Sequence, residues 1–300
     1  MNTQKKTKAG MIAIVGRPNV GKSTLTNALV GEKIAIVSNK PQTTRNRIAA
    51  VVDRGPDQFV FLDTPGLHKA RTRLGDYMVK VVKESVADVD AVLLLVEPIP
   101  HIGGPEAELI QRIKSLGVPA VLVINKIDTV EKEKLLAVMG AYGAAHDFDA
   151  ILPLSAKNGE GVEDLLKVLE AFLPEGPQLF PDDMVTDQPE RQVCAEIIRE
   201  KLLLCLDKEI PHGTAVEITK FSERDDEVIE LDATIYCEKA SHKGIIIGKG
   251  GAMLKKISTL ARADIERFMG GKVFLQTWVK VKENWRDNMN LIRNFGYRDE

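Results

Sequence analysis

The chain has 300 residues, of which 44% are hydrophobic and 28% are charged, and its formal net charge is −2. Its length exceeds the usual size of one domain and predicts two, and its composition excludes a largely disordered chain. The longest apolar runs, residues 91–96 and 118–124, are far shorter than the roughly 18 residues of a membrane-spanning helix. The near-neutral charge gives no whole-chain reason to expect a nucleic-acid partner.

The number and spacing of the cysteines indicate a reducing cellular compartment. Cys194, Cys205 and Cys237 are odd in number and form no CxxC pair, which favours buried thiols in a reducing environment over disulfides or structural zinc. The apolar run near the N-terminus stops at residue 15, too soon for a secretory signal. We therefore expect a cytoplasmic protein.

The first half of the sequence alternates strand-like and helix-like segments. Residues 11–15 form an apolar run that ends at a glycine, and residues 23–30 place apolar side chains at helical spacing. The later apolar runs are 59–62, 91–96, 120–124 and 150–154, and the amphipathic stretches between them are 77–89 and 106–116. Such alternation, with polar residues where strands end, predicts a doubly wound, mostly parallel α/β sheet.

The second half has a different texture. After a helix predicted at 162–173, four prolines between 174 and 189 indicate an extended linker. The elements expected beyond it are a helix at 191–206, strands at 215–221 and 228–237, a helix at 252–268, a strand at 273–281 and a short final helix at 284–295. We therefore predict a first domain at 1–174, a linker at 175–190 and a smaller α+β domain at 191–300.

A phosphate-binding loop is indicated by residues 16–23, which fit GxxxxGK[ST] and lie between the first predicted strand and helix. Glycines let successive N–H groups face a phosphate, the helix start adds a positive dipole, and Lys22 adds a positive charge that also serves catalysis. Ser23 is then expected to ligate Mg²⁺; the competing interpretation is a glycine-rich turn with a chance lysine. The nucleotide-binding residues predicted here are Gly16, Arg17, Pro18, Asn19, Val20, Gly21, Lys22, Ser23 and Thr24.

A second motif follows the strand at 59–62. Asp63 is expected to lie beside the phosphate loop and to hold the Mg²⁺ shell, as the aspartate of a Walker-B motif does, although a plain DTPG turn is the alternative. The nucleotide-binding residues predicted here are Asp63, Thr64, Pro65, Gly66 and Leu67, with Gly66 also assigned to catalysis.

Two further strand ends predict a guanine pocket. The carboxylate of Asp128 can accept hydrogen bonds from N1–H and the exocyclic amine of guanine, a pair that adenine does not present. This favours GTP over ATP. A backbone N–H of the later turn is expected near guanine O6. The residues predicted for the pocket are Asn125, Lys126, Ile127, Asp128, Ser155, Ala156 and Lys157.

These four elements, in this order, resemble the Ras-like translation-factor GTPases. The resemblance implies a fifth element between Lys22 and Asp63, and Thr43-Thr44-Arg45 is the candidate. Its threonine would reach Mg²⁺ with the hydroxyl and sense the γ-phosphate with the backbone N–H. We assign this role to Thr44 rather than Thr43.

One position departs from the Ras-like pattern. Ras-like enzymes place a water-orienting glutamine where this chain has Leu67, and leucine does not polarise water. A resemblance to GTPases that have an apolar residue here, several of which use K⁺ held by a phosphate-loop asparagine, makes K⁺ a second candidate cofactor and Asn19 its ligand. His68 is the obvious alternative base, but we interpret it as a mobile loop histidine.

The second domain contains a GxxG turn at 248–251 between two predicted helices, with two strands before them and one after. This resembles a KH domain of the bacterial type II order, which grips single-stranded RNA through the GxxG turn and an adjacent apolar groove. A glycine-rich turn with a solvated lysine is the alternative. The predicted RNA contacts are Lys243, Ile247, Gly248, Lys249, Gly250, Gly251 and Lys255.

Charge segregation favours the RNA interpretation. Residues 237–282 contain ten basic and three acidic residues, so they carry +7 while the rest of the chain carries −9. Extending the window to residue 300 leaves +6. A basic domain on an acidic remainder predicts a polyanionic partner and reverses the inference from the average charge.

The full set of motifs, together with residues 195–202 and 278–282, resembles the Era family of bacterial GTPases. The resemblance implies a GTP/GDP switch that binds the 3′ region of 16S ribosomal RNA, acts in 16S rRNA processing and 30S ribosomal subunit biogenesis, and associates peripherally with the inner membrane. We expect a monomer. The alternative is an RNA-binding assembly factor in which nucleotide is a structural ligand and hydrolysis is incidental. A membrane-surface role has little support, because the final helix mixes apolar residues with charges of both signs.

Overall fold

The structure is a computed structural model that describes residues 7–67, 70–224 and 227–297, and the chain divides into two units. The first unit comprises Met1–Ala35, Thr44–Lys69 and Tyr77–Asp187, and the second comprises Ile36–Thr43, Ala70–Asp76 and Gln188–Glu300. Two short segments from the first half of the sequence therefore belong to the second unit. The sequence analysis did not anticipate this.

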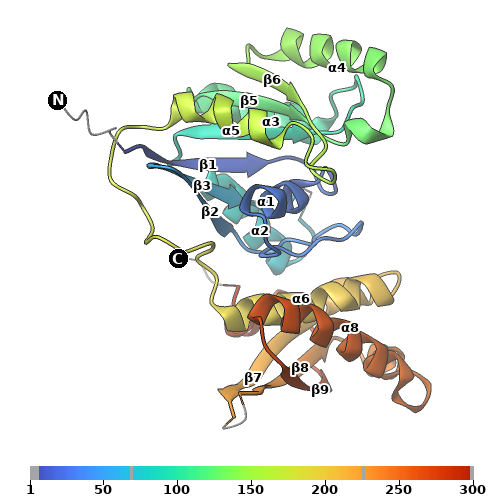
Figure 1. Ribbon diagram of the computed structural model, residues 1–300. Helices are drawn as coiled ribbons and strands as arrows, with labels where there is room; N and C mark the ends of the chain where they lie inside the picture. Colours follow the sequence, from blue (N-terminus) through green and yellow to red (C-terminus); the bar gives the residue numbers. More distant parts are fainter. Residues whose placement is uncertain (1–6, 68–69, 225–226, 298–300) are drawn as a thin grey trace, which may run out of the picture. The chain divides into compact units, whose positions relative to one another are not determined.

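The first unit is built on a six-stranded sheet with the order β2-β3-β1-β4-β5-β6 (Figure 1). Its strands are β1 (Ala9–Val15), β2 (Ile48–Arg54), β3 (Asp57–Asp63), β4 (Ala91–Val96), β5 (Ala120–Ile124) and β6 (Ala150–Pro153). All neighbouring strands are parallel except the β2–β3 pair, which is antiparallel. The sequence analysis missed β2 and found the other five strands.

Helices cover both faces of this sheet. Alternate residues of β1 enter two different apolar clusters, since Ile12 and Ile14 pack in one and Ala13 and Val15 in the other. The first cluster includes helices α1 (Lys22–Val30) and α5 (Val162–Leu169), and the second includes α3 (Gly104–Leu116), α4 (Lys132–Ala145) and the part of α2 (Arg73–Ser85) from Tyr77 onward. Helix α2 begins four residues earlier than predicted, and α4 was not predicted.

The proline-rich segment after α5 forms neither an α-helix nor a named strand and contains a turn at 182–183, and its residues up to Asp187 belong to the first unit. The Gln58 side chain accepts hydrogen bonds from the backbone N–H groups of Leu179 (2.8 Å) and Phe180 (2.9 Å). Further along, the Val51 N–H donates to the Val185 carbonyl at 3.0 Å. Val51 is on β2, an edge strand of the sheet, so this last bond satisfies an N–H group that the edge would otherwise leave exposed.

The second unit contains a three-stranded sheet of β7 (Ala215–Glu223), β8 (Ile229–Cys237) and β9 (Val273–Val281) (Figure 1). Strands β7 and β8 are antiparallel, and β8 and β9 are parallel. Helices α6 (Glu190–Cys205), α7 (Ala240–Ile247) and α8 (Ala252–Met269) share an apolar core with this sheet. The order helix, strand, strand, helix, helix, strand is the predicted one.

The end of the chain differs from the single predicted helix at 284–295. A 3₁₀ turn at Trp285–Asp287 is followed by α9 (Met289–Asn294). The break occurs because Asn288 leaves helical geometry and its side chain accepts hydrogen bonds from two N–H groups of α9. Trp285 is fully buried, and its indole N–H donates to the Gly213 carbonyl at 2.9 Å. Among the described residues, no helix has the length and apolar character that crossing a bilayer requires.

Replacing Trp285 with alanine should destabilise the second unit strongly. We expect a loss of about 3–5 kcal/mol, because the substitution leaves a cavity and an unpaired carbonyl at Gly213. The chain has two tryptophans, so Trp278 fluorescence reports urea unfolding of this variant. The matched control is Trp278→Ala, since Trp278 is 44% exposed, and it should change stability by no more than about 0.5 kcal/mol. Equal effects of the two substitutions would contradict this packing.

Candidate nucleotide-binding site and nucleic-acid interface

The loop between β1 and α1 holds a buried lysine. The Lys22 ammonium donates hydrogen bonds to the carbonyls of Gly16 and Arg17, each at 3.2 Å, and the residue is 6% exposed. Burial lowers the pKa of Lys22 to about 8, although the nearby Asp63 carboxylate acts in the opposite direction. A bound phosphate would supply negative charge beside this desolvated cation.

Two glycines permit the close packing of this loop. Gly21 has a φ of +100°, and a Cβ there would lie 2.2 Å from the Asn125 side-chain nitrogen. A Cβ on Gly66 would come within 2.7 Å of the Pro18 backbone nitrogen. The motifs after β3 and β5 therefore approach the phosphate loop at distances that only glycine allows.

Three side-chain oxygens converge beside Lys22. The Ser23 hydroxyl lies 2.8 Å from the Thr44 hydroxyl and donates to Asp63 Oδ2 at 2.8 Å. Asp63 Oδ1 is buried and has no hydrogen-bond partner among the described residues, and burial raises the pKa of Asp63 to about 6, against the opposing effect of Lys22. The Thr43 hydroxyl instead donates to the Lys40 carbonyl at 2.6 Å. Hard oxygen donors with an orphaned carboxylate oxygen fit a Mg²⁺ ion.

The predicted base pocket is joined to the phosphate loop by Asn125. Its side-chain nitrogen donates to the Val20 carbonyl at 2.8 Å, and its side-chain oxygen accepts from the Ala156 N–H at 3.0 Å. Asp128 is exposed, and its carboxylate accepts from the Ser155 hydroxyl at 2.7 Å. Buried Asn125 thus holds the two loops together and leaves a carboxylate facing solvent, where a base can approach.

A charged cluster that the sequence analysis missed supports these loops. The Lys126 ammonium donates to the Asn19 carbonyl and to Glu97, both at 2.6 Å, and Arg17 also pairs with Glu97. Burial raises the pKa of Glu97, but Lys126 and Arg17 outweigh this and hold it below its usual range. Glu97 directly follows β4, and a charged residue at a strand end could have been recognised from the sequence as a candidate for this cluster.

In the second unit, the GxxG turn connects α7 and α8. Gly248, Gly250 and Gly251 all have positive φ, at +74°, +58° and +81°. A Cβ on Gly248 would lie 2.7 Å from the Met253 Cβ, whereas nothing lies within 4 Å of a Cβ on Gly250. Lys249 at the turn and Lys255 on α8 are exposed, and Lys243 and Ile247 on α7 are half-buried. The predicted RNA contacts therefore share one turn and its two flanking helices.

Comparison with known proteins identifies the relatives of this chain. The family described as "50S ribosome-binding GTPase" matches residues 11–126, and the family described as "KH domain" matches residues 209–286. GTPase Era of Ruminiclostridium cellulolyticum is 52% identical over 291 residues, which cover 97% of this chain and 98% of that protein. GTPase Era of Clostridioides difficile is 52% identical over 295 residues, with 98% and 99% covered. The chain belongs to the GTPase Era family.

Solved Era structures share the fold. An Aquifex aeolicus Era variant bound to GDP and AlF₄⁻ has a TM-score of 0.94 and 38% identity, and the match covers 97% of this chain and all of that one. An Era complex with MgGDPNP and nucleotides 1506–1542 of 16S ribosomal RNA has the same TM-score and identity, with 98% and 100% covered. The predicted fold class, a P-loop GTPase sheet followed by a KH domain, is confirmed, and the chain is a GTPase.

Leu67 has a packing role in this Era family member. It is 7% exposed and belongs to the apolar cluster that includes Ala13 and Val15. Its backbone N–H donates to the Gly16 carbonyl at 3.3 Å. Leu67 therefore stabilises the loop and offers no polar atom from its side chain to an attacking water. His68 lies outside the described residues.

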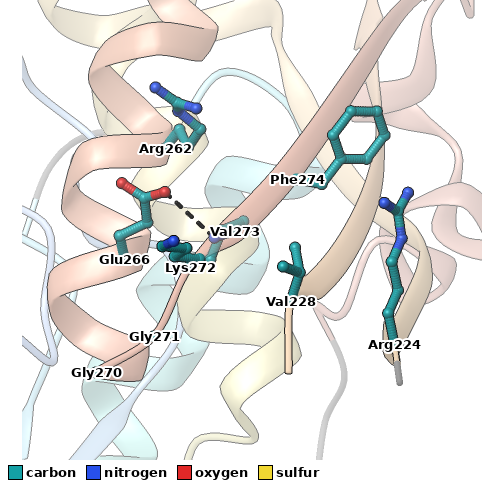
Figure 2. A pocket seen from close by; sticks show the side chains of 9 residues that line it. All are labelled: Arg224, Val228, Arg262, Glu266, Gly270, Gly271, Lys272, Val273 and Phe274. Carbon is teal, nitrogen blue, oxygen red and sulfur yellow. Dashed lines mark hydrogen bonds between the residues drawn. The ribbon is translucent and has the colours of Figure 1, made fainter. Parts of the chain in front are cut away.

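A basic cleft that was not predicted lies at the end of α8 away from the GxxG turn (Figure 2). Its volume is about 710 Å³, and the Arg224 guanidinium lies 4.6 Å from the centre of the exposed Phe274 ring. The Glu266 carboxylate accepts from the Val273 N–H at 3.2 Å. The residues lining the cleft are Arg224, Val228, Arg262, Glu266, Gly270, Gly271, Lys272, Val273 and Phe274.

Replacing Asp128 with alanine should abolish the preference for guanine. Two hydrogen bonds to a carboxylate, each worth about 1.5–3 kcal/mol, would be lost, so GTP affinity should fall by at least about 100-fold. Discrimination between GTP and inosine triphosphate, which lacks the exocyclic amine, should also disappear. Fluorescent-nucleotide titration measures both effects. Asp164→Ala, an exposed site on α5, is the matched control; retained discrimination in the Asp128 variant would exclude this role.

Proposed function

We propose that this Era family GTPase is a GTP-dependent switch that controls RNA binding by its KH domain. The observation that carries the proposal is the convergence of Ser23, Thr44 and Asp63 beside buried Lys22. The first turn of α1, the end of β3 and the loop that contains Thr44 meet there, so a ligand at this point can order all three. The proposed domain limits are 1–174 and 191–300, with a linker between them.

In the proposed mechanism, the phosphate-loop N–H groups and Lys22 hold the β- and γ-phosphates, and Ser23, Thr44 and Asp63 hold Mg²⁺. When bound, Mg²⁺ neutralises phosphate charge as the terminal bond breaks. The N–H groups of Thr44 and Gly66 contact the γ-phosphate and lose that contact when phosphate leaves. The MgGDPNP complex of a solved Era relative supports this assignment. Base recognition falls to Asp128 and the 155–157 turn.

The proposed partner of the KH domain is single-stranded RNA from the 3′ region of 16S ribosomal RNA, in the setting of 30S subunit biogenesis. Three observations support it: the excess of basic residues at 237–282, the GxxG turn, and the RNA fragment bound in a solved Era relative. The exposed Lys249 and Lys255 are suited to phosphate contacts, and Ile247 to an apolar base contact. A monomer in the cytoplasm is part of the proposal. A peripheral membrane contact rests on the family resemblance alone.

The second candidate function is an RNA-binding assembly factor with incidental hydrolysis. Buried Leu67 favours it, because this residue gives the attacking water no polar contact. The two candidates differ in coupling. A switch requires RNA affinity to differ between the GTP-analogue and GDP states, whereas a structural nucleotide requires only that some nucleotide be bound. Equal RNA affinities in the two states would establish the assembly-factor alternative.

Hydrolysis should depend on the monovalent cation. Because Leu67 gives the attacking water no polar contact, we expect another charge to assist hydrolysis, and K⁺ held near the Asn19 side chain would supply it. The kcat for GTP should be higher in KCl than in NaCl at equal ionic strength. Asn19→Ala should remove the difference without abolishing nucleotide binding. Equal rates of the unsubstituted protein in the two salts would exclude K⁺ as a cofactor.

A carboxylate in the GxxG turn should repel RNA. Gly250→Asp is better suited than Gly248→Asp, because a Cβ at Gly250 meets nothing while one at Gly248 meets Met253. The matched control is Gly250→Asn, since asparagine has the same shape and also tolerates positive φ. RNA affinity, measured by fluorescence anisotropy, should fall about tenfold or more in the aspartate variant relative to the asparagine variant. Equal affinities would remove the turn from the RNA interface.

A further inference from the structure

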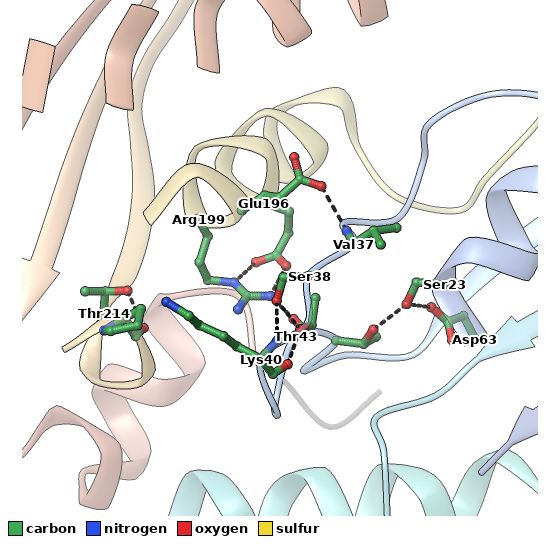
Figure 3. A network of polar contacts seen from close by, with 12 residues as sticks. Ser23, Val37, Ser38, Lys40, Thr43, Asp63, Glu196, Arg199 and Thr214 are labelled. Carbon is green, nitrogen blue, oxygen red and sulfur yellow. Dashed lines mark hydrogen bonds and ion pairs between the residues drawn. The ribbon is translucent and has the colours of Figure 1, made fainter. Parts of the chain in front are cut away.

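Residues Ile36–Thr43 lie in the same unit as α6 because of specific polar contacts (Figure 3). Arg199 of α6 donates from Nη2 to the Thr43 carbonyl. The Glu200 carboxylate accepts from the Val37 N–H at 2.9 Å. Lys40 donates to the Leu206 carbonyl just beyond the helix. Helix α6 therefore contacts both ends of the segment that leads into Thr44, and the residue just after the helix contacts its middle.

The Arg199 contact is made by a buried charge. Arg199 is 0% exposed, and its Nε donates to Glu196 at 2.8 Å. Burial lowers the pKa of Arg199, but the pairing with Glu196 outweighs this and raises it above its usual value. Breaking the contact with Thr43 would deprive a buried guanidinium of one acceptor, and a buried charge with missing partners is costly. The position of the Thr43 carbonyl is thus tightly specified.

The segment also has internal bonds that hold its end. The Thr43 hydroxyl lies 2.8 Å from the Ser38 hydroxyl and donates to the Lys40 carbonyl. The Lys40 N–H in turn donates to the Ser38 hydroxyl at 3.1 Å. Residues 38–43 therefore form a closed loop, and a shift at one of these residues is transmitted to the others.

The Thr43 carbonyl and the Thr44 N–H belong to one peptide group. A trans peptide is planar, so fixing the direction of its C=O fixes the direction of its N–H. Arg199 holds the oxygen of this group, and the Thr44 hydroxyl on its other side lies 2.8 Å from Ser23. The N–H assigned above to the γ-phosphate is therefore oriented by an arginine more than 150 residues away in the sequence.

The same stretch of α6 also contacts the RNA-binding helix. Lys201 donates to Glu200 at 2.6 Å and to Asp264 of α8. Burial lowers the pKa of Lys201, but its bonds to Asp264 and Glu200 outweigh this and raise it. Helix α8 begins at Ala252, directly after the GxxG turn. Consecutive residues of α6 thus bond to residues 36–43, here called the switch segment, and to α8, the helix that follows the RNA-contacting turn.

We infer that Arg199 is a positioning residue that orients the Thr43–Thr44 peptide, so that the γ-phosphate state is transmitted to α6 and α8 of the KH unit. The inference rests on the proposed function and names its coupling residue. Because coupling is reciprocal, RNA that favours this arrangement of α6 and α8 should also favour GTP over GDP. A second segment points the same way: in the 70–76 stretch, which follows Leu67, the Arg73 N–H donates to Asp287 at 3.0 Å within the same unit.

The first test measures nucleotide affinity without RNA. Arg199→Lys keeps the positive charge and shortens the donor fork, so affinity for a non-hydrolysable GTP analogue with Mg²⁺ should fall about tenfold. GDP affinity should stay unchanged, because GDP has no γ-phosphate for Thr44 to contact. The matched control is Arg191→Lys, an exposed arginine of the same helix, which should change neither affinity. Equal losses for analogue and GDP, or no loss for either, would overturn the inference.

A milder variant guards against misfolding. Lys40→Ala removes the donor of the hydrogen bond to the Leu206 carbonyl and changes no residue of α6. It should lower analogue affinity in the same direction, with Lys132→Ala on the exposed face of α4 as control. A double-mutant cycle of Arg199→Lys with Thr44→Ala should be non-additive, since one changes the orientation of Thr44 and the other removes its hydroxyl. Additive losses would show that Arg199 acts elsewhere.

The second test separates this inference from the proposed function. RNA affinity is measured with the GTP analogue and with GDP for the unsubstituted protein and Arg199→Lys. A difference between nucleotides that shrinks in the variant supports the inference. A difference that persists undiminished overturns it and leaves the proposed switch intact. If the unsubstituted protein shows no difference, the proposed switch fails, and a normal analogue affinity of Arg199→Lys would then overturn the positioning role as well.

Discussion

Two buried charges, Lys22 and Asp63, impose the constraint on which the nucleotide site depends. Burial lowers the pKa of Lys22 to about 8 and raises that of Asp63 to about 6, so each side chain loses part of the stability of its charged form. Each acts on the other with opposite charge, but one oxygen of Asp63 still has no hydrogen-bond partner among the described residues. An anion beside Lys22 and a cation beside Asp63 would stabilise both buried charges. A magnesium–nucleotide complex provides such an anion and such a cation.

The segment that leads into Thr44, residues 36–43, is held by contacts outside the six-stranded sheet. Thr44 is 8% exposed and contributes an oxygen to the site, but the residues before it, 36–43, belong to the KH unit. Their anchors on α6 are two buried residues, Arg199 and Glu200, which are 0% and 3% exposed. This segment leads into Thr44 at the nucleotide site and contacts α6 of its own unit along its length. It therefore offers a route by which hydrolysis can alter the RNA-binding part.

Sequence patterns predicted the elements that are local. Lys22, Asp63, Asn125 and the GxxG turn each belong to a short motif at the end of a strand or helix, where backbone geometry dictates residue type. The roles assigned to Thr44, Asn19 and the RNA-contacting lysines stay predictions. Strand β2 was missed because two of the five residues in its apolar run at 48–52 are alanine, a residue depleted in strands. Helix α4 was missed because it carries the 73% exposed Leu136 among small residues. The break at Asn288 depends on a side-chain cap.

The contacts of 36–43 with α6 were beyond local patterns, since they join backbone groups to side chains about 160 residues away. One signal was present: Arg199, Glu200 and Lys201 are consecutive, and three adjacent helical residues spread over too wide an arc to share one solvent face.

The most direct measurement of the central claim is hydrogen–deuterium exchange of the intact chain with Mg²⁺ and either a GTP analogue or GDP. The account predicts slower exchange in the analogue state both at residues 37–44 and along α6. Slower exchange confined to the phosphate loop, with both of those segments unchanged, would contradict it.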